Sequence, residues 1–202
     1  GCGTTSAAMM LNFNKGSRAF DRGRVDAGIR SYDMYTAPDE IQRFAQANGM
    51  DATVHVGTSM NELKGQIDQG LPVQVLMDVS ANHDGSGLHW VVATGYGRDA
   101  NGTAQIEVAN PHGDRQYVAE QDFAARWSDL NVKGLPIGIS RLAVSMQPAG
   151  GPKALLSDNA DDTFGTAASS LQAVRGVSQA ANGWKQGDYT QAAEGACRTV
   201  GG

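Results

Sequence analysis

The apolar periodicity of this chain changes near residue 71, and that change constrains the fold more than any other feature. Before it, apolar residues recur at helical spacing in residues 3–13, in TAPDEIQRFAQANGM and in TSMNELKGQIDQG. After it, short apolar or alternating runs such as PVQVLMDV are typical of strands. Helices followed by strands indicate an α+β domain in which N-terminal helices pack on an antiparallel sheet.

Two helices in the first half carry clear start and stop signals. Pro38 suits the first turn of a helix that ends at Gly49. Ser59 and Glu62 have the spacing of a capping box at the start of the next helix. Residues 14–35 are rich in glycine and charge without a steady period, and we predict mostly loop there. The segment DATVHVG alternates like a short strand.

The second half is predicted to consist mainly of strands. LHWVVATGYG and TAQIEVAN flank the turn RDANG, which predicts a hairpin. DRQYVA is a further short strand, and EQDFAARWS is a helix with Phe123 and Trp127 on one face. IGISRLAVSM is predicted as a last, single strand.

A length of 202 residues allows one domain with an appendage. We predict a domain at residues 1–147, a linker at residues 148–162 and a helical C-terminal extension at residues 163–202. The linker prediction rests on the Pro- and Gly-rich start of QPAGGPKALLSDNADD. The residues beyond it are rich in alanine and weakly amphipathic.

The composition argues against several partners. The net charge is −5 and no basic stripe is present, so nucleic acid is not an expected partner. No apolar run has the length of a membrane span, and the N-terminus shows no signal-peptide pattern. Cys2 and Cys197 are too few for a disulfide scaffold, and we expect both to be thiols.

Cys2 directly precedes the first predicted helix. The partial positive charge of a helix N-terminus favours the thiolate over the thiol, by about 0.3–1 kcal/mol. This effect alone does not make a strong nucleophile, so a base is needed. The hydroxyls of Thr4, Thr5 and Ser6 suit the first turn, where we expect them to satisfy open backbone amides.

Among the four histidines, His89 has the best setting for a base. It opens a predicted strand directly after the Gly-containing loop NHDGSG, and a histidine base also needs an acceptor that orients its ring. The next strand ends at Asn110, just before Pro111, so a hairpin would bring His89 and Asn110 together. Asp78 is the best placed of the alternative orienting groups, which also include Asp84 and Asp99.

The other histidines suit structural roles better. His55 lies within a strand, where a core hydrogen bond or solvent exposure is expected, and His112 lies in the turn after Asn110. His83 lies in the loop before His89. No cluster of cysteines or carboxylates completes a metal site with these two, so we expect neither a metal nor a cofactor.

The ordered motifs CGTTSAAMML, HWVVATGY and VANPHG resemble those of the papain-like cysteine peptidases. The similarity is greatest to their compact bacterial branch, which includes the bacteriocin-leader (double-glycine) peptidases, and it covers about residues 1–147. The resemblance implies a papain-like fold and assigns three catalytic roles: Cys2 as nucleophile, His89 as general base and acid, and Asn110 as the orienting residue.

The sequence departs from the family pattern just before Cys2. The family places a glutamine a few residues upstream, where its side chain donates to the oxyanion, whereas here only Gly1 precedes Cys2. We expect a further upstream segment that is absent from this sequence. The alternatives are a substitute donor elsewhere or an impaired site.

The resemblance predicts a hydrolase that cleaves a peptide bond in a protein or peptide substrate. Two alternatives remain open: an acyl-transfer enzyme of the deamidase or transglutaminase kind, and a catalytically impaired module that binds peptides. A free-standing peptidase with a helical tail also fits a bacterial effector or toxin that is secreted or delivered into another cell, with a cytoplasmic location as the alternative. An inhibitor or immunity protein is then a candidate partner.

Overall fold

The computed structural model describes residues 1–29, 36–128, 130–132 and 135–156, and it confirms an α+β fold of the papain-like kind. Its centre is a six-stranded antiparallel sheet with the strand order β1-β8-β2-β3-β4-β5, and β6 and β7 form a separate pair. The strands are β1 (Met50–His55), β2 (Val73–Asp78), β3 (Leu88–Arg98), β4 (Ala104–Ala109), β5 (Arg115–Ala119), β6 (Leu130–Val132), β7 (Leu135–Ile139) and β8 (Ala143–Pro148). The helices are α1 (Cys2–Lys15), α2 (Arg22–Gly28), α3 (Pro38–Ala47), α4 (Met60–Asp68) and α5 (Glu120–Trp127).

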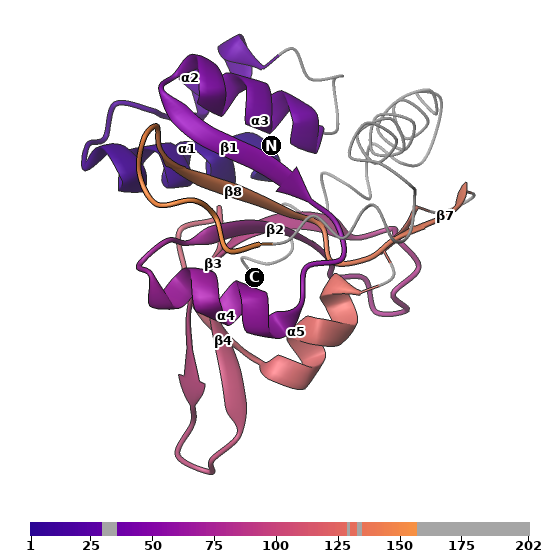
Figure 1. Cartoon of the computed structure of the whole chain (residues 1–202). Coiled ribbons are helices and arrows are strands. Elements are labelled where there is room, and N and C mark those ends of the chain that lie inside the picture. Colours follow the sequence, from indigo (N-terminus) through magenta and orange to yellow (C-terminus); the bar gives the residue numbers. More distant parts are fainter. Residues whose placement is uncertain (30–35, 129, 133–134, 157–202) are drawn as a thin grey trace.

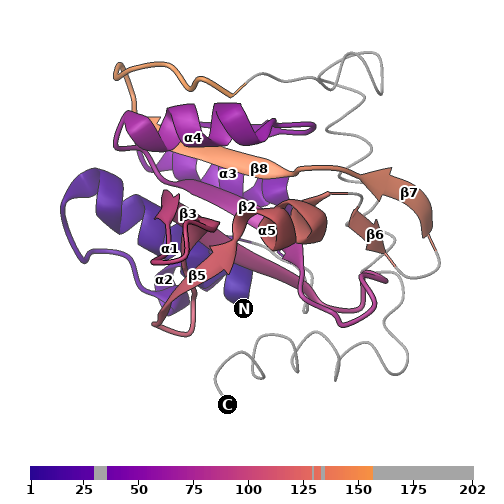
Figure 2. The same ribbon diagram turned by 90° about the horizontal axis from the view of Figure 1, so that it is seen from below.

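Helices cover both faces of the sheet (Figures 1 and 2). The three N-terminal helices α1, α2 and α3 lie on one face, and α4 and α5 lie on the other. The core on the α1 side includes Leu11, Trp90 and Val144. The core on the α5 side includes Val91 and Trp127. Because alternate residues of β3 enter different cores, this central strand is buried from both sides.

The capping signals act as the sequence predicts. The Ser59 backbone nitrogen donates to Glu62 Oε2 at 2.7 Å, and the Glu62 nitrogen donates to Ser59 Oγ at 3.1 Å, which is a complete capping box at α4. In α3, Pro38 occupies the first turn. This helix ends at Ala47, and Gly49 beyond it adopts a φ of 82°, which a residue without a Cβ tolerates best.

The prediction of mostly loop at residues 14–35 is wrong for α2. Asp21 caps this short helix by accepting from the Arg24 backbone nitrogen at 2.7 Å. Val25 is the residue of α2 that is buried, so the helix has too little apolar repetition to be recognised from its pattern. Tertiary contact with α1 therefore has to stabilise α2, because isolated helices of this length are marginal in water.

The predicted single strand at IGISRLAVSM is also wrong, because the chain breaks it into β7 and β8. The break lies at Arg141, which adopts a φ of 53°. The Arg141 backbone nitrogen donates to the Trp127 carbonyl at 2.9 Å, and the Gly57 nitrogen donates to the Ser140 carbonyl at 2.9 Å. These bonds direct the chain from the small β6–β7 pair back into the main sheet.

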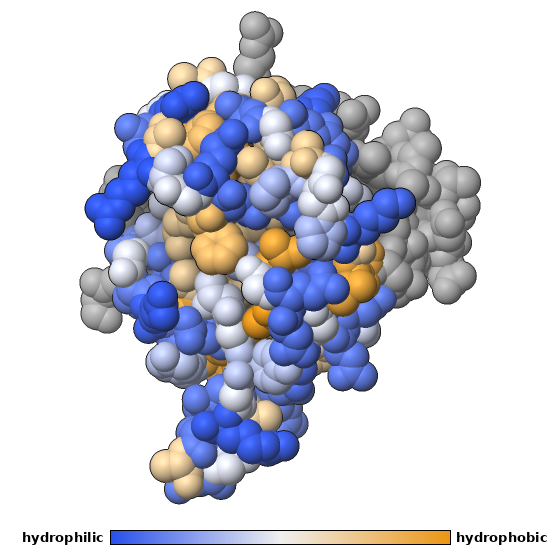
Figure 3. Space-filling view, turned by 60° about the vertical axis from the view of Figure 1, so that its left-hand side comes forward, coloured by the Kyte–Doolittle hydropathy of each residue, from blue (hydrophilic) through white to orange (hydrophobic). Residues whose placement is uncertain are grey.

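The predicted hairpin of β3 and β4 is present and projects from the body of the domain (Figure 1). Its register shifts between Ala93 and Gly95, and the Thr94 hydroxyl there donates to Glu107 Oε1 at 3.0 Å. Figure 3 shows the projecting part with a mainly hydrophilic surface. The start of β3, in contrast, lies in the buried centre of the sheet, and it carries His89.

Residues 149–156 return over α4. The Leu155 backbone nitrogen donates to Gln66 Oε1 at 2.8 Å, and Leu156 is buried in the α5-side core. The rest of the predicted linker and the predicted helical extension at residues 163–202 lie outside the described residues. None of the helices within the described ranges combines the length and hydropathy that crossing a bilayer requires.

Candidate active site

Cys2 is the first residue of α1, at the tip that meets the sheet. The next residue, Gly3, packs tightly against two side chains. A Cβ added to Gly3 would lie 2.5 Å from Thr36 Cβ and 2.9 Å from Trp90 Cδ1, closer than side-chain atoms approach in practice. The absence of a Cβ at Gly3 therefore lets the helix tip lie directly on Trp90, the residue that follows His89.

The hydroxyl groups of the first turn fit the prediction only at Thr4, whose Oγ1 accepts from the Gly1 nitrogen at 3.2 Å. Thr4 and Thr5 also donate to the Gly1 carbonyl, at 3.0 and 3.1 Å. Ser6 donates to the Trp90 carbonyl at 3.2 Å. The Thr4 and Thr5 hydroxyls thus bond within the first turn, whereas the Ser6 hydroxyl bonds to β3. The Ser6 bond is a second contact between α1 and the strand that carries His89.

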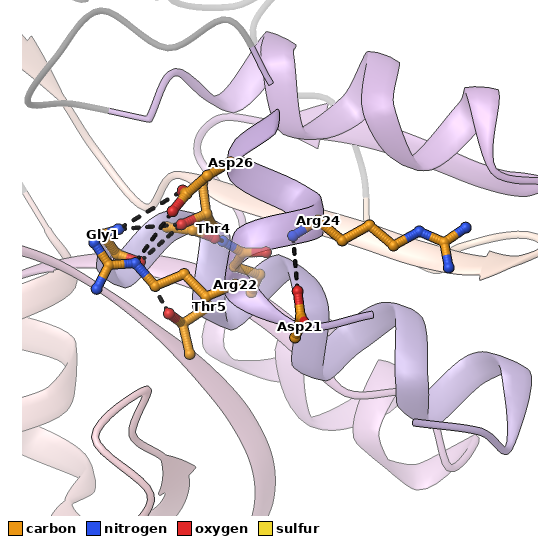
Figure 4. A network of polar contacts seen from close by, with 9 residues as sticks. Gly1, Thr4, Thr5, Asp21, Arg22, Arg24 and Asp26 are labelled. Carbon is orange, nitrogen blue, oxygen red and sulfur yellow. Dashed lines mark hydrogen bonds and ion pairs between the residues drawn. The ribbon is translucent and has the colours of Figure 1, made fainter. Parts of the chain in front are cut away.

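Helix α2 abuts the same tip (Figure 4). The Gly1 nitrogen lies 3.2 Å from Thr4 Oγ1 and 3.9 Å from Asp26 Oδ1, and Arg22 Nε donates to Asp26 Oδ2 at 3.2 Å. Asp26 and Arg22 were not candidates on sequence grounds, because α2 itself was not predicted. The Asp26 carboxylate thus places α2 beside Gly1, the residue before Cys2.

His89 and Asn110 come together as predicted from the hairpin. His89 Nε2 lies 3.3 Å from Asn110 Oδ1, and each residue is only 1% exposed. His89 is the second residue of β3, and Asn110 directly follows β4. The neighbouring antiparallel strands thus bring two residues that are 21 positions apart into contact.

The turn after β4 fixes the side chain of Asn110. The His112 backbone nitrogen donates to Asn110 Oδ1 at 3.2 Å. The Asn110 nitrogen donates to the Asp114 carbonyl, and the Gly113 nitrogen donates to the Asn110 carbonyl, both at 2.9 Å. Because Oδ1 accepts from a backbone N–H, the side-chain oxygen rather than the nitrogen faces His89, which makes Nε2 the protonated ring atom.

His112 contributes its ring as well as its backbone. The rings of His112 and His89 are stacked, with centroids 5.8 Å apart and planes inclined by 12°. The prediction of a turn residue at His112 therefore holds, and the ring also covers one face of the candidate base.

The remaining candidates occupy other positions. His55 is buried, and its Nε2 lies 2.8 Å from Ser145 Oγ in the neighbouring strand, so of the two alternatives for His55 the structure shows the core hydrogen bond. Asp78 accepts from the backbone nitrogens of Ser80 and Gly85, at 3.0 and 2.7 Å. Asp78 thus holds the loop before β3, and it is Asn110 that lies within hydrogen-bond distance of His89 Nε2. Trp90 packs in the α1-side core.

Within the described residues, His, Cys, Asp and Glu side chains form no group of three or more that would suit a metal ion. The candidate site offers a thiol, an imidazole and a side-chain amide. The structure brings the imidazole and the amide together, and it places Cys2 at the same end of β3 through Gly3 and Trp90.

Comparison with known proteins identifies the family. The peptidase C39-like family matches residues 1–134, which is two thirds of the chain, and the protein belongs to this family. Together with the papain-like fold, this membership supports a cysteine peptidase. No curated protein matches the chain.

Three solved structures have a similar fold. A Bacillus anthracis protein described as a C39-like peptidase has a TM-score of 0.55 at 17% identity, over 76% of this chain and 90% of that chain. The peptidase domain of Streptococcus ComA, a bifunctional ABC transporter in a quorum-sensing pathway, has a TM-score of 0.51 at 16% identity, over 73% and 90%. A double-glycine-motif protease from an AMS/PCAT transporter, solved with a leader peptide, has a TM-score of 0.50 at 14% identity, over 73% and 84%.

Proposed function

We propose that this protein is a cysteine peptidase that hydrolyses a peptide bond of a protein or peptide substrate through Cys2, His89 and Asn110. The observation that carries the proposal is the buried contact of 3.3 Å between His89 Nε2 and Asn110 Oδ1. This contact lies next to Trp90, on which the helix tip with Cys2 is packed. The fold and the family support the same chemistry.

The contact assigns separate tasks to the two ring nitrogens of His89. Nε2 carries a proton and donates a hydrogen bond to Asn110 Oδ1, so Nδ1 is the atom that exchanges a proton with the thiol. Asn110 in turn is oriented by the backbone nitrogen of His112. An imidazole that is held in one tautomer and one orientation is the usual requirement for a base that activates a nucleophile.

The reaction then proceeds in two halves. The Cys2 thiol gives its proton to His89, and the sulfur attacks the carbonyl carbon of the substrate peptide bond. The imidazolium donates this proton to the leaving amine as the C–N bond breaks, which leaves a thioester on Cys2. Water, deprotonated by His89, hydrolyses the thioester, releases the carboxylic acid and restores the thiol.

Alkylation kinetics test the coupling between Cys2 and His89 without knowledge of the substrate. In a Cys197→Ser background, iodoacetamide should react faster with Cys2 than with an ordinary cysteine near neutral pH, because an imidazole partner increases the thiolate fraction. His89→Ala should remove this advantage. His83→Ala is the matched control, since His83 is an exposed histidine of the preceding loop, and it should have no effect. Equal rates for the parent protein and His89→Ala would show that the pair is not coupled.

Incubation with protein substrates distinguishes the alternative chemistries. Peptide-bond cleavage produces two fragments and is lost in Cys2→Ala. Deamidation instead shifts the substrate mass by about one dalton without scission, because the same acyl-enzyme chemistry then acts on a side-chain amide. A peptide that binds the parent protein and Cys2→Ala equally, with no turnover by either, would identify an impaired binding module.

The biological setting follows from the resemblance alone. We propose an effector or toxin that is secreted or delivered into another bacterial cell, with an inhibitor or immunity protein as its partner. Inducible expression of the parent protein and of Cys2→Ala inside a bacterial host tests this proposal. Growth that is equally unaffected by both proteins would argue against the toxin role.

A further inference from the structure

Strand β2 carries a polar side chain, Gln74, between its apolar residues, in addition to Asp78 at its end. All six residues of this strand are buried, and Gln74 is 0% exposed. Its Nε2 donates to the carbonyl of Gly3, 71 positions earlier in the chain, at 3.2 Å. Its Oε1 has no hydrogen-bond partner among the described residues.

Stability alone does not account for Gln74. A buried side-chain carbonyl without a partner destabilises a fold, whereas an apolar residue of similar length would fill the same space without this cost. The other residues of β2 that enter the cores are apolar: Val73, Val75, Leu76 and Met77. The hydrogen bond to Gly3 is therefore the feature that distinguishes this position.

That bond acts on the helix turn that carries Cys2. Gly3 follows Cys2 directly, and Gln74 ties its carbonyl to β2. Ser6, in the same part of α1, donates to the Trp90 carbonyl in β3. Two hydrogen bonds thus join the start of the helix to two adjacent strands. A helix tip held at two points is restricted in both translation and rotation, which a single contact does not achieve.

We propose that Gln74 is a positioning residue that sets the location of the Cys2 sulfur relative to His89. This inference rests on the proposed function. Gln74 acts through Gly3 and does not touch the substrate. Without its donor, the first turn moves away from β2, and the sulfur leaves the geometry in which it exchanges a proton with the imidazole. A misplacement of about 1 Å costs about a hundredfold in rate in catalytic sites.

Gln74→Met tests the inference, with Gln66→Met as the matched control. Gln66 is also 0% exposed, and its Nε2 lacks a partner among the described residues. It lies on α4, against the opposite face of the sheet, and its Oε1 accepts from the Leu155 nitrogen. Both substitutions replace a buried amide by a thioether of similar length. Only the substitution at Gln74 removes a bond to the α1 tip.

The measurements are the pH profile of Cys2 alkylation by iodoacetamide in the full chain with Cys197→Ser, and the melting temperature. In Gln74→Met, we expect the rate constant near neutral pH to fall about tenfold or more. The midpoint of the profile should move toward that of an ordinary cysteine, while the melting temperature is unchanged or higher. Gln66→Met should keep the parent profile. Gln74→Leu repeats the test with a second apolar side chain if the methionine variant fails to fold.

The outcomes separate this inference from the proposed function. If Cys2 in the parent protein reacts like an ordinary cysteine and His89→Ala changes nothing, the proposed function is wrong and the inference fails with it. If Cys2 is activated and depends on His89 but Gln74→Met keeps the parent profile, only the inference is wrong. An equal loss of reactivity in Gln66→Met would likewise overturn it, because the effect would then belong to any buried glutamine.

Discussion

The imidazole of His112 lies parallel to that of His89, with ring centroids 5.8 Å apart and planes inclined by 12°. The backbone nitrogen of His112 also donates to Asn110 Oδ1, the oxygen that faces His89. One turn residue thus donates a main-chain hydrogen bond to the orienting amide and stacks its side chain on the candidate base.

These two contributions of His112 can be separated by substitution. His112→Phe keeps an aromatic ring over His89 and keeps the backbone donor, so Cys2 should be alkylated at nearly the parent rate. His112→Ala removes the ring and should lower the rate about two- to tenfold, since aromatic contacts contribute about 0.5–1.5 kcal/mol. The measurement is the alkylation rate by iodoacetamide near neutral pH. Equal rates for the alanine and phenylalanine variants would show that the ring has no role.

The orienting role of Asn110 predicts a difference between removal and replacement of its acceptor. Asn110→Ala deletes the oxygen that accepts from His89 Nε2, and the net value of one hydrogen bond, about 0.5–1.5 kcal/mol, corresponds to a loss of about two- to tenfold. Asn110→Asp keeps an oxygen at that position and should keep the His89-dependent reactivity of Cys2.

The matched control is Asn101→Ala, in the turn at the far end of the same hairpin, where the side chain is exposed. We expect the alkylation rate to be unchanged in this variant. If Asn110→Ala retained the full rate, or if Asn110→Asp lost it to the same extent as alanine, Asn110 would not orient the imidazole.

Glu40, in the first turn of α3, predicts a pH dependence of stability. Burial raises the pKa of its carboxyl above the ordinary value of 4.5, and the charge of Asp39 adds to this, against the opposing effects of the Ala37 amide and Arg43. The folded state therefore holds the proton more tightly than the unfolded state. As pH rises from the ordinary value through the raised pKa, the unfolded state loses its proton first and folding stability falls.

Glu40→Gln removes this titration. At pH values below the ordinary pKa, the melting temperature of Glu40→Gln should match that of the parent protein. As the pH rises from the ordinary to the raised pKa, the melting temperature of the variant should increasingly exceed that of the parent protein. Thermal unfolding followed by circular dichroism over a series of pH values measures the difference. A constant difference across the series would contradict the assigned cause, because a pH-independent effect does not come from titration of Glu40.

The parts of the fold that the sequence predicts correctly have local signals. The capping box at Ser59 and the turn RDANG each act within a few residues, and the structure contains the corresponding helix and hairpin. Helix α2 carries one buried apolar residue, Val25, so its amphipathic pattern is absent and its stability depends on packing against α1. The break at Arg141 depends on a backbone bond to Trp127, and the apolar run through this region gives no sign of it.

The same distinction applies to the site. The contact between His89 and Asn110 is predictable because both residues belong to one hairpin, whose pairing determines their separation. Gln74 has no such signal. Its side-chain nitrogen reaches the Gly3 carbonyl only because α1 packs across β2. The sequence around Gln74 gives no sign of this partner, which lies 71 positions away. The triad itself stays a prediction until the reactivity of Cys2 is measured.

The glycines on either side of Cys2 offer the sharpest test of how the helix tip is placed. A Cβ at Gly3 would meet Thr36 and Trp90 at 2.5–2.9 Å, whereas a Cβ at Gly1 would meet nothing within 4 Å. Gly3→Ala should therefore force the first turn of α1 away from β3, with a destabilisation of about 1–3 kcal/mol from overpacking. Gly1→Ala adds the same methyl group without a clash and should be neutral in stability.

The reactivity of Cys2 should also be lowered by Gly3→Ala and not by Gly1→Ala, although neither variant changes a residue of the proposed triad. We expect Gly3→Ala to lose most of the His89-dependent alkylation rate, because the tip that carries the sulfur is displaced from the strand that carries the imidazole. Gly1→Ala should keep it. Alkylation kinetics and thermal unfolding of the two variants provide both measurements. A fully reactive Gly3→Ala would show that close packing of the tip on Trp90 does not position the nucleophile.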